Sequence, residues 1–330
     1  MSGSDNGTVL AVRDVTVRFD SDEGSVHAVD RVSFDVTRGE VLAIVGESGC
    51  GKSVTTMSLL GLLPPTATVE GSARFNGGTE LIGAKESELR KIRGREISFV
   101  FQDPMTSLNP VFTVERQVGE VLRRHLGMSK SEARERTVEL LDLVGIPSPE
   151  RRVDEYPHQL SGGMRQRVVI AMALACDPKV LIADEPTTAL DVTIQAGILD
   201  LMRDIRERLG TAIVLITHNL GVVADIADRV LVMYAGRKAE EAPVADLYAE
   251  PQHPYTIGLL NAVPRPYESE DARRRLREIP GRVPSLRELP TMCAFADRCP
   301  RADELSRTQV PELRLVAPNH LVACFHPGPE

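Results

Sequence analysis

Residues 46–53 have the sequence Gly46-Glu47-Ser48-Gly49-Cys50-Gly51-Lys52-Ser53, and this stretch decides the fold. It matches the pattern Gly-x-x-x-x-Gly-Lys-Ser/Thr at every required position. An apolar run at 41–45 precedes it and predicts a strand, while residues 54–60 predict a helix that begins near Lys52. Glycines allow such a loop to curl with its N–H groups pointing inward, and the helix adds the positive end of its dipole. The stretch therefore predicts a binding loop for a polyphosphate.

The loop also predicts individual contacts with a nucleotide. Lys52 is expected to lie along the β- and γ-phosphates, and the Ser53 hydroxyl is expected to ligate Mg²⁺. The residues expected to surround the phosphates are Gly46, Glu47, Ser48, Gly49, Cys50, Gly51, Lys52, Ser53 and Val54. A glycine-rich turn that happens to precede Lys-Ser is the alternative, and the flanking strand and helix disfavour it.

The composition limits the class of protein. The chain has 330 residues, enough for two domains or for one large α/β domain with an appendage. No apolar run approaches the roughly 18 to 20 residues that span a bilayer, and the polar N-terminus lacks the features of a secretory signal. A net charge of −8 disfavours nucleic acid and anionic lipid as the main ligand. We therefore expect a cytoplasmic protein that reaches a membrane only through a partner.

Short strands and helices alternate along most of the chain. Strands are predicted at 9–12, 15–19, 26–29, 32–36, 41–45, 72–75, 97–101, 180–183, 212–216 and 229–234. Helices are predicted at 114–126, from 129 to about 144, after residues 161–163, and between the later strands. Ser129 and Glu132 form a capping-box pattern at the start of the second of these helices.

This order predicts an α/β fold with a mainly parallel sheet buried on both faces and an antiparallel β edge. The α/β frame is expected to cover residues 1–242, with a helical insert at about 103–177. Prolines and arginines become frequent from residue 243, so residues 243–330 are expected to form a small, loop-rich C-terminal extension.

Polar residues stand at the ends of three of the predicted strands. Asp184 and Glu185 end one strand, and their carboxylates suit the Mg²⁺ shell and the general base for an attacking water, respectively. Gln102 ends another strand and is expected to sense Mg²⁺ and the attacking water. His218 follows a third and is expected to contact a γ-phosphate, although a lone histidine is usually structural. In open α/β sheets ligands bind at the carboxyl ends of the strands, where these residues and the loop are expected to meet.

Residues 160–167, Leu-Ser-Gly-Gly-Met-Arg-Gln-Arg, resemble the signature sequence of ABC-transporter ATPases, which have the P-loop NTPase fold. The resemblance covers about residues 9–240 and implies that Ser161, Gly162 and Gly163 bind a γ-phosphate. It implies that residues 189–191, ending in Asp191, form the D-loop, and that Phe19 stacks on adenine. Phe19 has an alternative role as a core residue at a strand end. The cofactors implied are ATP and Mg²⁺.

The resemblance also implies partners. In this family two ATPase domains close head to tail over two ATP molecules, so a chain with one set of motifs needs a second copy or a paralogue. Residues 100–110 and 252–256 resemble the ATP-binding subunits of dipeptide, oligopeptide and nickel importers. This implies two transmembrane permease subunits, an extracellular substrate-binding protein and a place on the cytoplasmic face of the membrane. The segment 113–126, with the Gln102 loop, is expected to receive a cytoplasmic helix of a permease.

Peptide is the favoured substrate, and nickel or another small solute is the alternative. A non-transport ABC ATPase of translation or DNA repair is disfavoured, because those proteins usually carry two ATPase domains or long coiled coils. A redox- or metal-sensing role of the C-terminal tail would be an addition to catalysis, because Lys52, Glu185 and His218 are all present.

The five cysteines raise two separate questions. For Cys50, nearby N–H dipoles and Lys52 predict a lowered thiol pKa and a reactive side chain, with an inert, inward-turned thiol as the alternative. Cys293, Cys299 and Cys324 lie in the tail, where similar proteins carry four cysteines that imply a 4Fe–4S iron–sulfur cluster. Ser306 stands at the position of one of them, so an iron–sulfur cluster, zinc and no metal all stay open, with Ser306, His320 or His326 as a fourth ligand.

Overall fold

The computed structural model describes residues 7–21, 24–102, 107–187, 192–262, 279–284, 287 and 290–329. The chain divides into two compact units, each built from several stretches of sequence. The first contains residues 1–10, 36–40 and 84–215, and the second contains residues 11–35, 41–83 and 216–330. No helix within the described ranges is both long and apolar enough to cross a membrane.

The first unit combines parallel strands with a group of helices. Strand β6 (Ile97–Val100) pairs in parallel with β7 (Val180–Asp184), and β8 (Ala212–Ile216) lies on the other side of β7. All residues of β7 and β8 are buried, as expected of parallel strands covered on both faces. The predicted strands at 180–183 and 212–216 are confirmed.

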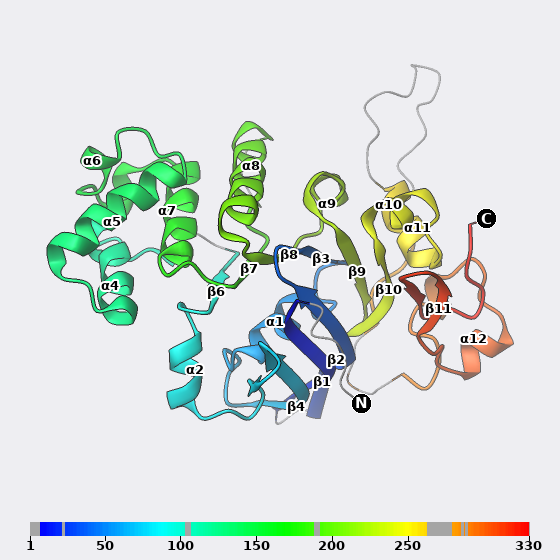
Figure 1. Cartoon of the computed structure of the whole chain (residues 1–330). Coiled ribbons are helices and arrows are strands. Elements are labelled where there is room, and N and C mark those ends of the chain that lie inside the picture. The colour runs from blue at the N-terminus through cyan, green and yellow to red at the C-terminus, as the bar shows by residue number, and fades with distance from the viewer. Residues whose placement is uncertain are drawn as a thin grey trace, which may run out of the picture. The chain divides into compact units, whose positions relative to one another are not determined.

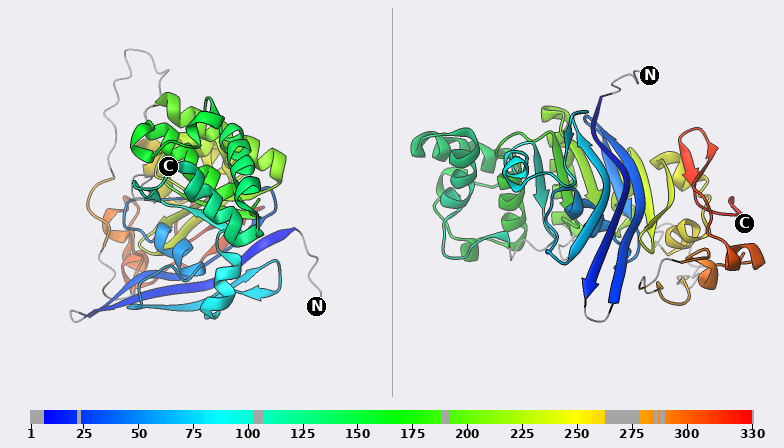
Figure 2. Two further views of the ribbon diagram at one scale, coloured as in Figure 1. Left: turned by 90° about the vertical axis from the view of Figure 1, so that its left-hand side faces the viewer. Right: turned by 90° about the horizontal axis from the view of Figure 1, so that it is seen from below.

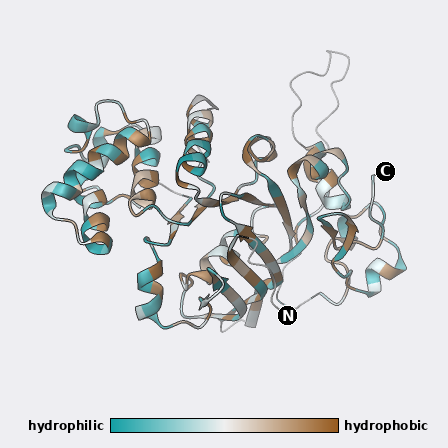
Figure 3. Ribbon diagram, in the orientation of Figure 1, coloured by the Kyte–Doolittle hydropathy of each residue, from teal (hydrophilic) through white to brown (hydrophobic). Residues whose placement is uncertain are grey.

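Helices α4 (Val114–Leu126), α5 (Lys130–Leu143), α6 (Pro149–Arg152) and α7 (Gly162–Leu174) pack together in this unit (Figure 1). Figure 3 shows both hydrophilic and hydrophobic residues along α4 and α5, which fits helices with one buried face. The capping box predicted at Ser129 and Glu132 is confirmed at the start of α5. The unit also contains α2 (Glu86–Ile92), the short 3₁₀ turn η1 (Pro157–Gln159) and α8 (Val192–Leu209).

The second unit contains the strand that leads into the glycine-rich loop. Strand β3 (Val41–Val45) pairs in parallel with β9 (Arg229–Tyr234), and β9 pairs in antiparallel fashion with β10 (Arg237–Pro243). The extension continues this sheet, because β12 (His320–Val322) pairs with β10 and β11 (Arg314–Ala317) pairs with β12. The helices of the unit are α1 (Lys52–Leu59), α9 (Leu220–Ile226), α10 (Val244–Ala249), α11 (Pro254–Asn261), α12 (Glu304–Thr308) and the 3₁₀ turn η2 (Ala296–Arg298).

The sequence predicted four short strands near the N-terminus. The structure has two long strands there instead, β1 (Thr8–Ser21) and β2 (Gly24–Thr37), which run side by side (Figure 2). Asp14 and Arg31 have φ of +48° and +49°, so the backbone is irregular where the sequence predicted breaks. The strands continue because the Asp14 N–H donates to Ser33 Oγ and the Arg31 N–H donates to Thr16 Oγ1. Strands β4 (Ala67–Phe75) and β5 (Thr79–Glu80) complete this second sheet, in the order β2-β1-β4-β5.

Strand β10 was not expected, because its sequence is mostly charged. Its buried Glu241 forms ion pairs with Arg229, at 3.0 Å, and with Lys238. Its neighbour Glu240 is fully buried against His320, at 2.7 Å. These contacts replace the hydration that the carboxylates lose on burial.

Candidate functional site

The glycine-rich loop joins the end of β3 to the start of α1, as predicted. Gly46, Gly49 and Gly51 have φ of +149°, +80° and +98°, values that L-residues with side chains rarely adopt. A Cβ on Gly46 would lie 2.3 Å from the Met233 carbonyl oxygen, and one on Gly51 would lie 2.5 Å from the Ala28 carbonyl oxygen. Both glycines are therefore required by close backbone packing as well as by the turn.

Lys52 is held inside the curl of this loop. Its side chain is buried, and Nζ donates hydrogen bonds to the carbonyl oxygens of Gly46, at 2.7 Å, and Glu47, at 2.9 Å. Ser53 is half-buried in the first turn of α1, where the positive end of the helix dipole lies. A lysine, a hydroxyl and a helix N-terminus gathered at one glycine loop fit the phosphates and the Mg²⁺ of a nucleotide.

Cys50 differs from the prediction. Its side chain is fully buried, and its Sγ lies 3.8 Å from Lys52 Nζ. Burial raises the thiol pKa by more than the lysine charge lowers it. The expected lowering of the Cys50 pKa is therefore wrong, because the thiol lies in the low-dielectric interior behind the loop.

The residue before His218 contacts the strand that carries the loop. The Thr217 N–H donates to the Ile44 carbonyl oxygen, at 3.2 Å, two residues before Gly46. His218 itself is exposed, and Asn219 next to it caps α9 by accepting from the N–H groups of Gly221 and Val222. The structure thus brings the His218 turn beside the end of β3, within the second unit.

Gln102 and Glu185 meet in the first unit. Gln102 Nε2 donates to Glu185 Oε2, at 2.9 Å, across the ends of the parallel strands β6 and β7. Asp184 is the last residue of β7 and is buried. Glu185 has φ of +46°, so the backbone leaves the strand direction at this residue. The structure therefore brings the Gln102 amide and the Glu185 carboxylate together, next to Asp184 in the chain, and oxygen donors of this kind suit Mg²⁺ and a water molecule.

The signature residues lie at the N-terminus of α7, also in the first unit. Ser161 is the N-cap, and its side chain accepts from the Met164 N–H at 3.3 Å. Ser161 and Gly162 are exposed, whereas a Cβ on Gly163 would lie 2.8 Å from Ile194 Cγ2 in α8. The exposed side of this 13-residue helix start can accept an anion, and the buried side packs on α8.

The structure gives less information about two other predicted nucleotide contacts, Asp191 and Phe19. Asp191 lies outside the described residues, as does the rest of the predicted D-loop. Phe19 is a half-buried residue of β1.

The C-terminal cysteines gather around one small cavity. Cys293, Cys299, Cys324, Ser306 and His326 line a space of about 20 Å³, the size of a single water molecule. Ser306 Oγ donates to the Asp303 carbonyl oxygen, at 2.9 Å, and accepts from the Asp303 N–H, at 2.8 Å. Burial raises the pKa of all three thiols, that of Cys324 to about 11.

These residues do not fit a metal group as they are arranged. Three thiols line the cavity, and the candidate fourth ligand Ser306 is occupied in the N-terminal cap of α12. His320 contacts Glu240 instead of the cysteines. Within the part of the chain that the structure describes, no group of three or more His, Cys, Asp and Glu side chains is placed to hold a metal ion.

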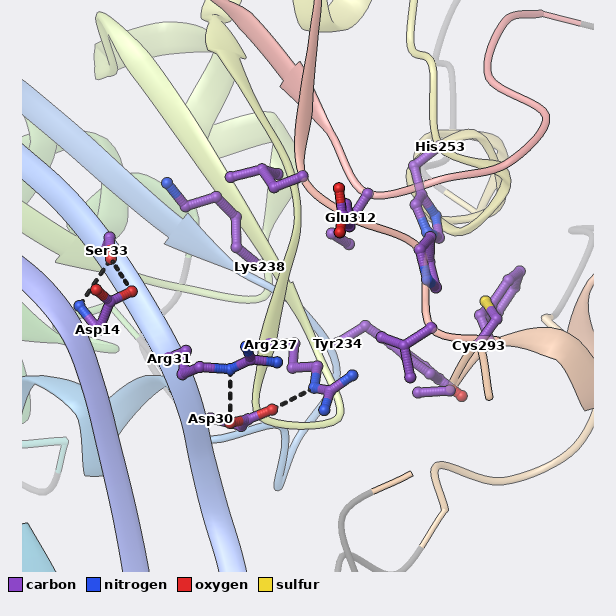
Figure 4. A pocket seen from close by; sticks show the side chains of 17 residues that line it. Asp14, Asp30, Arg31, Ser33, Tyr234, Arg237, Lys238, His253, Cys293 and Glu312 are labelled. Carbon is purple, nitrogen blue, oxygen red and sulfur yellow. Dashed lines mark hydrogen bonds and ion pairs between the residues drawn. The ribbon is translucent and has the colours of Figure 1, made fainter. Parts of the chain in front are cut away.

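A cavity of about 620 Å³ lies beside β10 and does not include the glycine-rich loop (Figure 4). Three of its charged residues pair with one another: Asp30 accepts from Arg237, at 2.6 Å, and lies 3.4 Å from Arg31. Cavity size therefore does not locate the nucleotide site, which the loop geometry identifies instead.

Sequence reasoning missed two residues that contact the loop. Arg298 pairs with the Glu47 carboxylate, and the Tyr255 hydroxyl accepts from the Glu47 N–H. More than 200 positions separate each of them from Glu47. No local pattern could therefore have indicated the contacts, although Tyr255 lies in the stretch that resembled peptide importers.

Comparison with known proteins agrees with this geometry. Residues 29–188 match the family model described as ABC transporter, and residues 239–305 match the model described as oligopeptide/dipeptide transporter, C-terminal region. The oligopeptide transport ATP-binding protein OppD of Salmonella typhimurium is 52% identical over 322 residues, which cover 98% of this chain and 95% of that protein. The dipeptide transport ATP-binding protein DppD of Bacillus subtilis is 51% identical over 318 residues, covering 96% and 94%.

Solved structures with the same fold include ATP-binding cassettes. A dimer of the cassette MJ0796, in a post-hydrolysis state with ADP and Pi, matches with a TM-score of 0.64 and 32% identity. The match covers 71% of this chain and 98% of that one. The protein cbiO1 of Clostridium perfringens, part of an ABC transporter complex, matches with a TM-score of 0.62 and 30% identity, covering 74% and 92%.

Proposed function

Because the chain belongs to the ABC transporter family, in its oligopeptide and dipeptide transport group, we propose that it hydrolyses ATP to drive the import of di- or oligopeptides. The observation that carries this function is the buried Lys52 in a glycine loop between β3 and α1, in a chain whose C-terminal part matches the peptide-transporter region. Glycine loops of this construction bind the phosphates of nucleotides.

In the proposed site, different residues bind the nucleotide, bind Mg²⁺ and activate the attacking water. Lys52 and the backbone of residues 46–54 hold the phosphates, and Phe19 lies against adenine. Ser53 and Gln102 would hold Mg²⁺, with Asp184 acting through water, and the ion when bound would supply positive charge to the phosphate oxygens. Glu185, oriented by the Gln102 amide 2.9 Å from its carboxylate, accepts the proton of the attacking water, and His218 contacts the γ-phosphate.

The proposed partners follow from the incomplete site of a single chain. Ser161, Gly162, Gly163 and Asp191 serve the nucleotide bound by a second ATPase subunit, which is a paralogue or another copy. Two permease subunits and an extracellular binding protein complete the importer, with this chain on the cytoplasmic face of the membrane. The homologues' names as transport ATP-binding proteins support this assembly.

We further propose that the permease docks beside the start of α4. Phe101 and Val111 are large apolar residues that are 43% and 68% exposed near the Gln102 loop, so they offer apolar area to a partner helix. Arg116 in the first turn of α4 lies over the Phe112 ring, at 3.6 Å, and stiffens this edge.

The proposed domain division places the ATPase domain at residues 1–242, with its helical insert at 103–177, and the extension at 243–330. The two family matches, at 29–188 and 239–305, support a change of character near residue 240. The extension is held to the sheet by the pairing of β12 with β10.

Reconstitution tests the function. The chain, its partner ATPase and two permease subunits are placed in liposomes, and ATP hydrolysis is measured with the binding protein loaded with peptide or with nickel. We expect hydrolysis that rises with the peptide-loaded protein and falls by about 10²- to 10⁴-fold in Glu185→Gln. Stimulation by nickel alone would favour the nickel importer, and no hydrolysis under any condition would contradict the proposal.

A further inference from the structure

The C-terminal extension contacts the phosphate loop through a two-point ion pair. Arg298 Nη1 donates to Glu47 Oε2, at 2.6 Å, and Nη2 donates to Glu47 Oε1, at 2.9 Å. The Arg298 side chain is only 4% exposed, while that of Glu47 is 30% exposed. A paired guanidinium and carboxylate in this geometry fix orientation as well as charge. Glu47 is the second residue of the phosphate loop, so the extension directly contacts a residue of the proposed nucleotide site.

Glu47 is held at its backbone as well. Its N–H donates to the Tyr255 hydroxyl, at 2.8 Å, and its carbonyl oxygen accepts from Lys52 Nζ, at 2.9 Å. Glu47 thus contacts the extension through its carboxylate and its N–H group. Its carbonyl oxygen contacts Lys52, the lysine expected to bind the phosphates. Movement of Glu47 would move the carbonyl oxygen that orients Lys52.

The residues that hold Glu47 are themselves rigidly placed. Arg298 Nε donates to the Pro280 carbonyl oxygen, at 2.8 Å, and Nη2 also donates to the Ile279 carbonyl oxygen, at 3.2 Å. Tyr255 is fully buried, and its ring packs 4.7 Å from that of Tyr234 and 5.5 Å from that of Phe295. Because few rotamers are open to such side chains, they can position a loop without a large entropic cost.

The pair also sets the charge beside the phosphates. A carboxylate in a loop that binds a polyanion repels the ligand unless it is neutralised, and Arg298 neutralises it. Conversely, Arg298 is buried and needs a counter-ion, which only an acidic residue at position 47 supplies among its contacts described here.

We propose that Arg298, with Tyr255, is a positioning residue for ATP binding: the extension holds Glu47 so that the phosphate loop and Lys52 keep their binding conformation. This inference rests on the proposed function of the loop as the ATP site. It assigns the extension a part in nucleotide affinity, beyond any part in contacting transport partners.

A double-mutant cycle on the full chain tests the inference. Affinity for ATP is measured by calorimetry with Mg²⁺ for the wild type, Arg298→Gln, Glu47→Gln and the double variant, together with their melting temperatures. Arg301→Gln is the matched control, because Arg301 also bonds backbone carbonyls of the extension, those of His326 and Gly328, without touching the loop.

We expect Arg298→Gln to weaken ATP binding by about 5- to 50-fold, the usual size of a coupling between sites. The double variant should bind ATP more tightly than Arg298→Gln, because no unpaired carboxylate is left beside the phosphates. Arg301→Gln should bind ATP within about twofold of the wild type, whatever its effect on melting. Tyr255→Phe, which removes one hydroxyl, should weaken binding by a smaller factor and serves as the test if Arg298→Gln does not fold.

Wild-type affinity in a folded Arg298→Gln or Tyr255→Phe variant, with only a lower melting temperature, would show a merely structural role and overturn the inference. Independent, multiplying effects of the Arg298 and Glu47 substitutions would overturn it as well. Failure of the wild type to bind ATP would overturn the proposed function and, with it, this inference.

Discussion

Single residues at the ends of β6 and β7 carry the proposed chemistry. The left-handed backbone of Glu185 directs the chain away from β7 and leaves its carboxylate 2.9 Å from the Gln102 amide nitrogen. A general base needs both a fixed position and a group that keeps it oriented, and this contact supplies the second.

Glu185→Gln should lower ATP hydrolysis by about 10²- to 10⁴-fold and leave ATP affinity nearly unchanged. The amide has the same shape and can still accept from Gln102, but it cannot take a proton from water. Single-turnover hydrolysis and equilibrium binding of ATP measure the two effects. Glu135→Gln, at an exposed position of α5, is the control, and near-normal turnover in Glu185→Gln would exclude Glu185 as the base.

Cys50 should react slowly with alkylating reagents in the folded protein. Burial raises its pKa, so the thiolate fraction at pH 8 is smaller than that of an unfolded cysteine, and the rise of the rate with pH is displaced upward. Mass spectrometry of iodoacetamide-treated native and denatured protein, from pH 7 to pH 10, measures the rates. Equal rates in the two states at pH 8 would show that the thiol is open to solvent.

At the scale of elements, several helices begin at a side chain that satisfies a backbone N–H. Thr113, Ser129 and Ser161 do so for α4, α5 and α7. His253 does so for α11, where its Nδ1 accepts from the Tyr255 N–H at 3.0 Å. This cap differs from the others because it can titrate, and only the neutral ring can accept the bond.

The start of α11 should lose stability as the pH falls. Burial lowers the pKa of His253 from an ordinary value of 6.5 to about 4, an effect that a hydrogen bond to the Ala323 carbonyl partly offsets. Since the folded pKa lies below the unfolded one, its stabilising contribution is complete above pH 6.5 and is lost between pH 6.5 and about 4. The loss should reach roughly 2 kcal/mol at pH 5.

His253→Asn is the matched variant, because asparagine caps helices without titrating. Urea unfolding at pH 7.5 and pH 5 should show a smaller loss of unfolding free energy in the variant than in the wild type. Parallel losses in the two proteins would exclude His253 as the source.

At the scale of the whole chain, one buried carboxylate ties the extension to the sheet. Glu240 of β10 accepts from the N–H groups of Gln252 and His253, at 2.7 and 2.9 Å, and contacts His320 of β12. These hydrogen bonds add to the apolar contacts of the extension, among them the packing of Tyr255 and Phe295 on Tyr234, and small appended regions often need such a further tie. In this chain the hydrogen bonds to Glu240 are one such tie.

Glu240→Gln should loosen the extension by roughly 2–3 kcal/mol, because one acceptor oxygen becomes a donor that faces another N–H group. Limited proteolysis of residues 243–330 and hydrogen exchange at 320–322 measure the loosening. Glu250→Gln, at an exposed position, is the control. Equal proteolysis of the two variants would show that Glu240 does not hold the extension.

Features that depend on neighbouring residues could be predicted from the sequence alone. The glycine loop between β3 and α1, the helices α4, α5 and α7, the capping box of α5 and the buried strands β7 and β8 were all predicted from patterns a few residues long. These patterns suffice because turn geometry, capping and burial period are set by local backbone chemistry. The neighbouring positions of Gln102 and Glu185 were predictable for a related reason, since parallel strands end at one edge of a sheet.

Features that join distant segments of the chain depend on the folded structure and could not be predicted from the sequence. The charged strand β10 exists because its carboxylates meet Arg229 and His320, and β1 and β2 continue through irregular residues because side chains across the pair supply hydrogen bonds. The pKa of Cys50 depends on burial, which sequence neighbours do not reveal. The contact of Arg298 with Glu47 joins positions 251 residues apart, and the free energy of such a contact depends on a desolvated geometry that only the folded chain creates.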